Sequence, residues 1–288
     1  MKLPLTIALL LPVVLPAAFA LPADRVVVVC SCSTGAYREA LDGIREALGR
    51  DPVVVEPEVA AVARSVVQDP GRVYIAVGRD ALHAAAAHGE LPVIGALVLH
   101  EDAAEGTLPA GRIELDVPPQ VLLQEVRRLF PDKTRIGVLI RPGADRSALA
   151  ARARQLGLAL EFAEVSGPAA LVKTFLSLKG RVQLALTLPD GLLYNSATVK
   201  ALVMASLEHN LPLIGFSAAF VRAGAAAGVF ADFRDAGRQA AETALRYEPG
   251  RGGRAVEPPR RVNVAVNLRV LRLLGLVYAH DEGVTVYR

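Results

Sequence analysis

Short apolar runs rich in β-branched residues alternate along the chain with segments of helical periodicity. The predicted strands of the first part are residues 25–30 (R-V-V-V-V-C), 52–55, 73–77 (V-Y-I-A-V) and 92–98. Residues 37–48 place their apolar side chains on one face of a helix, and a further helix is predicted to begin near Asp80. Strands that alternate with helices predict a parallel sheet flanked by helices, in the α/β class.

The alternation restarts after Pro118 and Pro119, a pair that interrupts any helix and favours an extended preceding residue. The second set of predicted strands is 135–140, 158–165, 182–188 and 213–216, and its predicted helices are 120–130, 146–156 and 198–209. A restart of the same pattern favours two similar lobes over one continuous sheet.

The last part of the chain predicts crossings between these lobes. Its predicted elements are a strand at 228–230, a helix at 234–247, a strand at 262–266 and a helix at 268–274. We expect residues 21–116 and 232–255 to form lobe 1, and residues 117–231 and 256–288 to form lobe 2. Ligands of open α/β sheets bind beyond the carboxyl ends of the strands, so two facing sheets predict a cleft lined by loops.

The first twenty residues have the features of a signal peptide. Lys2 supplies a positive charge, residues 3–16 are apolar, and Ala18-Phe19-Ala20 has the small-x-small form of a cleavage site. Three prolines and the short apolar length disfavour a membrane anchor. We therefore expect cleavage after Ala20 and a periplasmic mature protein.

Composition and charge narrow the class of protein. The chain is 52% hydrophobic and 21% charged, which suits a packed core, and its net charge of +3 is too small and too scattered for a nucleic-acid-binding protein. If the strand includes Cys30 and Cys32, they share one face and cannot easily bridge each other, which favours two reduced or loosely used thiols at a strand end and leaves their redox state open. The Cys and His spacings match no metal site, and we expect no metal, no cofactor and no catalytic residue.

Polar residues that follow the strands of lobe 1 are candidate ligand contacts. Ser31, Ser33 and Thr34 lie between the first strand and a helix, where hydroxyl and backbone N–H groups suit a carboxylate or serve only as helix caps. Gly78, after the third strand, allows a ligand to approach the backbone or simply begins a helix.

Lobe 2 supplies charged, polar and aromatic candidates. Arg141 could bind a carboxylate with its two-pronged guanidinium group, and Asp190 could pair with an ammonium group or start a turn. The remaining candidate contacts are Tyr194, Asn195, Ser217, Phe220 and Asp232.

Four segments in order carry a family resemblance. They are T-L-P-D-G-L-L-Y-N-S from Thr187, L-P-L-I-G-F-S-A-A-F-V-R-A-G-A from Leu211, D-F-R-D-A-G-R-Q-A-A from Asp232 and V-N-L-R-V-L-R-L-L-G-L from Val266. This set resembles the substrate-binding proteins of ABC transporters, of the small-solute family whose members bind amino acids such as tryptophan. The earlier part of the chain resembles the first lobe of that family more loosely.

The resemblance implies a two-lobed periplasmic-binding-protein-like fold with three hinge crossovers. It implies a solute-binding component of an ABC importer, not an enzyme, whose solute is an amino acid or small organic acid. The partner would be an ABC permease, the only route by which the chain contacts a membrane. Hinge closure over the solute would be the mechanism.

Two other functions remain open. The chain could present its solute to a membrane sensor instead of a permease. Gly215-Phe216-Ser217-Ala218-Ala219 is also close to the G-x-S-x-G nucleophile motif, with Asp232 and His280 following in hydrolase order. A serine hydrolase using Ser217 is therefore the alternative from a different class.

Overall fold

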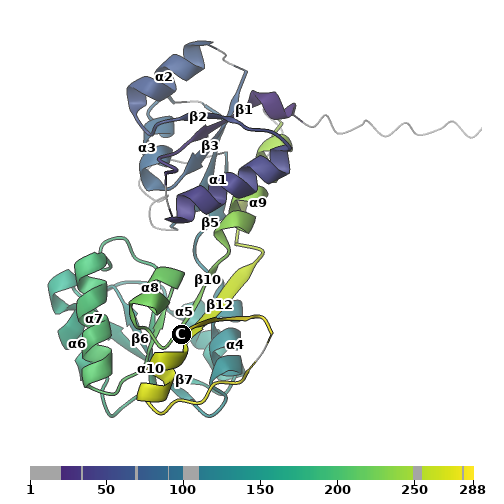
Figure 1. The fold of residues 1–288 in the computed structure, drawn as a ribbon. Helices are drawn as coiled ribbons and strands as arrows, with labels where there is room; N and C mark the ends of the chain where they lie inside the picture. Colours follow the sequence, from purple (N-terminus) through teal and green to yellow (C-terminus); the bar gives the residue numbers. More distant parts are fainter. Residues whose placement is uncertain are drawn as a thin grey trace, which may run out of the picture.

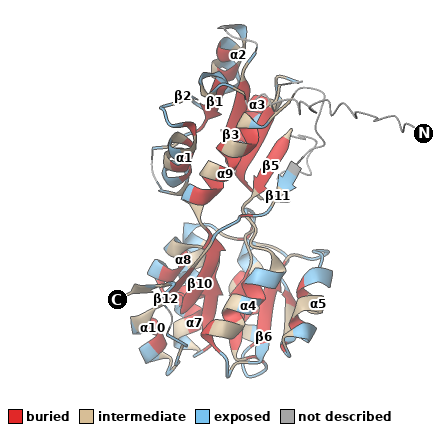
Figure 2. Ribbon diagram, turned by 90° about the vertical axis from the view of Figure 1, so that its right-hand side faces the viewer, coloured by how far each residue is buried: buried red, intermediate tan, exposed pale blue. Residues whose placement is uncertain are grey.

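The computed structural model describes residues 21–33, 35–68, 71–89, 91–99, 110–248, 255–280 and 282–288, and it shows two lobes (Figure 1). The predicted signal peptide, residues 1–20, and the candidate Thr34 lie outside the described residues. Each lobe has a sheet with buried strands and helices on both faces (Figure 2). The predicted two-lobed α/β class is confirmed.

Lobe 1 contains a six-stranded parallel sheet with the order β11-β5-β4-β3-β1-β2. Its strands are β1 (Val26–Val29), β2 (Val53–Val55), β3 (Val73–Val77), β4 (Val93–Val98), β5 (Gly111–Glu114) and β11 (Ala255–Glu257). Its helices are α1 (Gly35–Leu48), α2 (Val59–Gln68), α3 (Arg79–Ala86) and α9 (Phe233–Leu245).

The valines of β1 explain why helices cover both faces of this sheet. Side chains alternate along a strand, so Val26 and Val28 pack in the cluster that includes residues of α1 and α9. Val27 and Val29 point the other way, into the cluster with residues of α2 and α3. A run of four buried valines therefore requires an apolar layer on each side.

Lobe 2 contains a seven-stranded sheet with the order β13-β12-β10-β9-β8-β6-β7, in which only the β10–β12 pair is antiparallel among the described residues. Its strands are β6 (Arg135–Ile140), β7 (Ala159–Glu164), β8 (Leu184–Thr187), β9 (Leu213–Gly215), β10 (Ala227–Ala231), β12 (Val262–Asn267) and β13 (Val284–Tyr287). Its helices are α4 (Pro119–Leu129), α5 (Ser147–Gln155), α6 (Leu171–Ser177), α7 (Ser196–Glu208), α8 (Ala218–Ala223) and α10 (Leu268–Leu273).

The chain crosses between the lobes three times: between β5 and α4, between β10 and α9, and between β11 and β12. The boundary expected at residue 255 is wrong by a few residues. β11 pairs with β5, with Val256 opposite Arg112, so residues 256 and 257 belong to lobe 1. The Gly/Arg/Pro-rich sequence hid this short strand, and the third crossing lies at 258–261.

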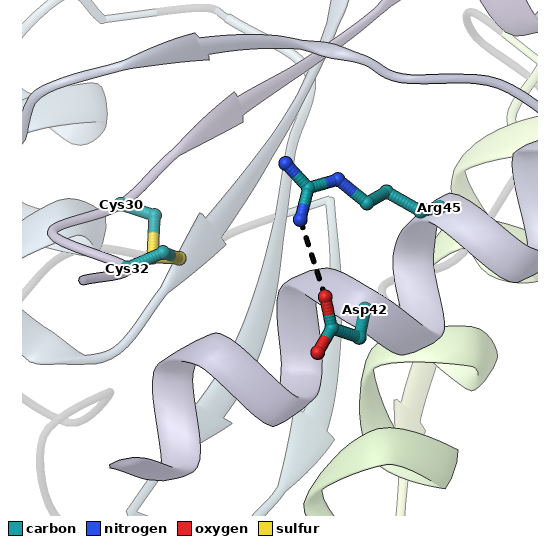
Figure 3. Close-up of a disulfide and its surroundings, with 4 residues drawn as sticks. All are labelled: Cys30, Cys32, Asp42 and Arg45. Carbon is teal, nitrogen blue, oxygen red and sulfur yellow. Dashed lines mark hydrogen bonds and ion pairs between the residues drawn. A yellow bond between two sulfur atoms is a disulfide. The ribbon is translucent and has the colours of Figure 1, made fainter. Parts of the chain in front are cut away.

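The expectation that Cys30 and Cys32 do not bridge is also wrong. They form a disulfide with a Cα–Cα distance of 5.2 Å, at the end of β1 and beside α1, where Asp42 and Arg45 form an ion pair (Figure 3). The expectation assumed that the strand continues through Cys32. β1 instead ends at Val29 and the chain turns at Cys32 and Ser33, which brings the two Cα atoms within normal disulfide range.

Candidate functional site

The strand directions show which loops face the other lobe. β5 leads into the first crossing, and β1, β3 and β4 belong to the same parallel set, so their carboxyl ends face lobe 2. β10 leads into the second crossing, and β6, β8 and β9 belong to its parallel set. The loops approach each other closely: a Cβ atom on Gly191, after β8, would lie 3.9 Å from Leu99 Cδ1, after β4.

An ion pair stands on the side of lobe 2 whose loops face lobe 1. Arg141 follows β6 and Asp190 follows the adjacent strand β8, and Arg141 Nε donates to Asp190 Oδ2 at 2.5 Å. The other carboxylate oxygen, Oδ1, accepts from the backbone N–H groups of Leu192 at 2.9 Å and Leu193 at 3.0 Å. The Asp190 side chain is 11% exposed and that of Arg141 is 35% exposed, so both charges are held in place and partly accessible. Two of the predicted contacts are thus brought together from positions 49 residues apart.

An aromatic cluster lies beside this pair. Tyr194, Phe216 and Phe220 contact one another edge-on, with ring centroids 5.1–5.8 Å apart. Phe220 is only 2% exposed, so most of its ring packs in the core of lobe 2. Burial first, and then the charge of Asp190, raise the pKa of the Tyr194 hydroxyl, which keeps it protonated.

Three predicted polar contacts serve as helix caps. Asn195 accepts from the N–H groups of Ala197 and Thr198 at the start of α7, both at 3.0 Å. Ser217 accepts from Phe220 N at 3.2 Å at the start of α8, and Asp232 accepts from Asp235 N at 2.9 Å at the start of α9. Each oxygen satisfies a backbone donor that the helix leaves without a partner.

A groove continues from the cleft end of lobe 2 between α7 and α8. It has a volume of about 560 Å³, and Tyr194, Asn195, Phe216 and Ser217 line the end nearest the carboxyl ends of β8 and β9. The rest of its wall is mainly apolar and includes Val203 and Met204. Of the lobe 2 candidates, two form the ion pair, Asp232 lies in neither the pair nor the groove, and the rest line the groove: Tyr194, Asn195, Ser217 and Phe220.

The lobe 1 side is formed by the loop that the disulfide closes. Ser31 and Ser33 are exposed on either side of Cys32. Gly78 has a positive φ of 85°, a conformation that favours glycine, and a Cβ atom there would also displace the Tyr37 ring. Tyr37, 38% exposed in the first turn of α1, was missed by the sequence reasoning. An aromatic residue just after the first strand, in a chain with only six tyrosines, was the available signal.

The hydrolase constellation is not assembled in the structure. Ser217 caps α8, Asp232 caps α9, and the His280 ring packs on Tyr278 with centroids 5.4 Å apart. No hydrogen bond joins Ser217, Asp232 and His280 in the described part of the chain. The described residues also contain no cluster of three or more His, Cys, Asp or Glu side chains placed to hold a metal ion.

No protein-family model and no curated protein sequence matches the chain. It is similar to a ligand-free, open substrate-binding protein with adhesive properties from Clostridium difficile, at TM-score 0.69 and 18% identity over 91% of this chain and 98% of that one. An ABC domain in complex with L-Trp from Streptococcus pneumoniae matches at TM-score 0.61 and 18% identity, over 91% and 99%. A periplasmic ribose ABC transporter protein from Conexibacter woesei matches at TM-score 0.52 and 15% identity, over 87% and 94%.

At these identities the likeness establishes the fold, that of the two-lobed substrate-binding proteins of ABC transporters. Among the residues that the structure describes, no helix has both the length and the apolar character needed to cross a membrane.

Proposed function

We propose that the chain is the solute-binding component of an ABC importer, exported to the periplasm and cleaved after Ala20. The observation that supports this most directly is the Arg141–Asp190 pair, which lies at the carboxyl ends of adjacent strands on the side of lobe 2 that faces lobe 1. The solute-binding folds to which the chain is similar supply the context. The partner would be an ABC permease that recognises the closed form.

The charges of the pair favour an amino acid or a small organic acid as the solute. The Arg141 guanidinium group can bind a carboxylate through two parallel hydrogen bonds. The Asp190 carboxylate, already fixed by two backbone N–H groups, can accept from an ammonium group. A solute with both groups would exchange the internal ion pair for two charged contacts of the same kind, so little electrostatic free energy is lost on binding. No covalent chemistry is required.

A thermal-shift screen of the mature protein from Leu21 tests this function. The panel contains amino acids, small carboxylates, sugars and purines. A solute at about 100 times its dissociation constant adds about 2.7 kcal/mol to the free energy of unfolding, which raises the midpoint by several degrees. We expect a shift with amino acids or small carboxylates.

The variant Asp190→Asn tests whether the thermal shift comes from a solute that binds beside the Arg141–Asp190 pair. Asparagine keeps an oxygen that accepts from Leu192 and Leu193 but removes the charge, so we expect affinity for a solute with an ammonium group to fall about tenfold or more. A carboxylate without an ammonium group should not bind more weakly, because it gains nothing from the charge of Asp190. Glu161→Gln is the matched control, because Glu161 forms a 2.5 Å ion pair with Arg181 on the surface of the same lobe. A full panel without a shift, or equal losses in both variants, would contradict the proposal.

A further inference from the structure

A second concave site lies on lobe 2, away from the cleft. It is a cavity of about 530 Å³ lined by Leu268, Arg269, Arg272 and Arg288. β12 begins at the third crossing, and α10 follows its other end, so the cavity lies at the end of β12 far from the crossing. All three arginines are exposed, so their guanidinium groups are accessible to a ligand in solution or at a surface.

The fold brings these arginines together from two elements. Arg269 and Arg272 are three residues apart on α10, and side chains at that spacing lie on the same face of a helix. β13 runs parallel to β12 with Tyr287 opposite Asn267, so Arg288 emerges beside the start of α10.

A contact from α8 fixes the end of β13. Arg222 donates to the Tyr287 hydroxyl at 3.3 Å, and its guanidinium carbon lies 5.6 Å from the centre of the Tyr287 ring. This contact orders the residue next to Arg288 and places a further positive charge nearby.

No Asp or Glu side chain forms an ion pair with the cluster within the described parts of the chain. α8, β12, α10 and β13 contain no Asp or Glu, and Arg269, Arg272 and Arg288 form no ion pair there. Elsewhere in lobe 2, Arg128 pairs with Glu125 at 2.6 Å. Like charges repel, so an anion bound among the three arginines would relieve repulsion and would not have to displace a paired Asp or Glu side chain.

We propose that this cavity binds a phosphate group, carried by a soluble phosphate ester or by a phospholipid headgroup. The planar guanidinium groups match the geometry of phosphate oxygens and bind them in pairs. Three cations around one cavity suit a group with several oxygens and up to two negative charges better than a single carboxylate. In the lipid case, Leu273, which is 67% exposed and follows Arg272, would lie against the apolar part of the membrane surface.

The test has two arms, both on the mature protein from Leu21. In the first, glycerol 3-phosphate and inorganic phosphate are titrated and followed by NMR chemical shifts, with sodium chloride at equal ionic strength as the reference. In the second, the protein is sedimented with phosphatidylcholine vesicles that contain or lack phosphatidylglycerol.

The variant is Arg269→Gln/Arg272→Gln, and the control is Arg50→Gln/Arg64→Gln, which removes the same charge from exposed positions of lobe 1. We expect binding in at least one arm, weakened about tenfold or more in the variant and unchanged in the control.

The arm in which binding is seen identifies the source of the phosphate group. Binding in neither arm, an equal response to sodium chloride, or an equal loss in the control would overturn the proposal. Unchanged circular dichroism and an unchanged solute response in the variant would show that its fold is intact.

Discussion

Cys30 and Cys32 close a very short covalent loop at the lobe 1 side of the cleft (Figure 3). Cys30 is fully buried among residues of β3, β4 and α1, whereas Cys32 is partly exposed. The disulfide therefore anchors the loop that carries Ser31 and Ser33 to the core of lobe 1. In the chain-entropy account, such a short loop stabilises the fold less than a long one would.

Cys32→Ser tests the contribution of this bond. We expect the free energy of unfolding to fall by about 1–2 kcal/mol, because a three-residue loop restricts the unfolded chain only modestly. Denaturant unfolding with and without dithiothreitol measures it. Reduction should lower the stability of the unmodified protein to the value of the variant and leave the variant unchanged. A reductant that has no effect on the unmodified protein would show that the thiols are not bridged.

Individual site residues also show what could not be predicted from the sequence. A Ser, Asn or Asp between a strand and a helix suits a ligand and a helix cap equally well, and the structure uses Asn195, Ser217 and Asp232 as caps. The Arg141–Asp190 contact could not be predicted, because it depends on β6 and β8 being neighbours in the sheet. Each residue was recognisable by its place after a strand, but their pairing was not.

At the scale of elements, the contact between α1 and α9 holds lobe 1 together across almost 200 residues of chain. The two helices lie side by side in the upper lobe of Figure 1. Gly43 of α1 faces the carbonyl of Arg234, and Gly237 of α9 faces the carbonyl of Ala40. The backbones are so close that a Cβ atom at either glycine would collide with the opposite helix. Ion pairs from Arg234 and Arg238 to Glu46 border this contact.

Gly237→Ala is expected to destabilise the protein by about 1–3 kcal/mol, because the added methyl group forces the helices apart. Helix propensity acts in the opposite direction, since alanine is favoured over glycine by about 1 kcal/mol in a helix. Denaturant unfolding measures the balance. Gly167→Ala is the control, since no atom lies within 4 Å of the added Cβ there and its φ of 163° is extended backbone. Equal stabilities for the two variants would contradict the backbone contact.

The helices and strands that were predicted correctly are those whose hydrophobic pattern extends over the whole element. The strands predicted at 73–77 and 135–140 coincide with β3 and β6. The missed elements are α2, α6, α8, β5, β11 and β13. β5 was missed because its sequence, G-R-I-E, includes two charged residues that are tolerated inside the lobe through a 2.7 Å ion pair between Arg112 and Glu114. α8 has only six residues, which is too short for a helical period to be evident.

At the scale of the whole molecule, the crossings determine which parts can move together. Asp232 N donates to Arg261 O at 3.0 Å, so the second and third crossings are joined. Gln239 of α9 donates to Pro258 O at 3.1 Å and accepts from Arg260 N at 3.3 Å, which fixes the third crossing to lobe 1. These contacts hold the third crossing against α9 of lobe 1, so in the proposed closure we expect the pivot to lie where the second and third crossings enter lobe 2.

Closure of the lobes is the last consequence of the proposed function. A solute held by Arg141 and Asp190 gains contacts from the lobe 1 loop only when the lobes approach, so binding should favour the closed form. Small-angle X-ray scattering with a saturating solute from the thermal-shift panel should then show a smaller radius of gyration than without it. Asp190→Asn should need about tenfold more solute, or more, for the same decrease, since it binds less tightly. If a solute binds at the cleft and the scattering stays the same, the two lobes do not close, and recognition by a permease would have to rely on the open form.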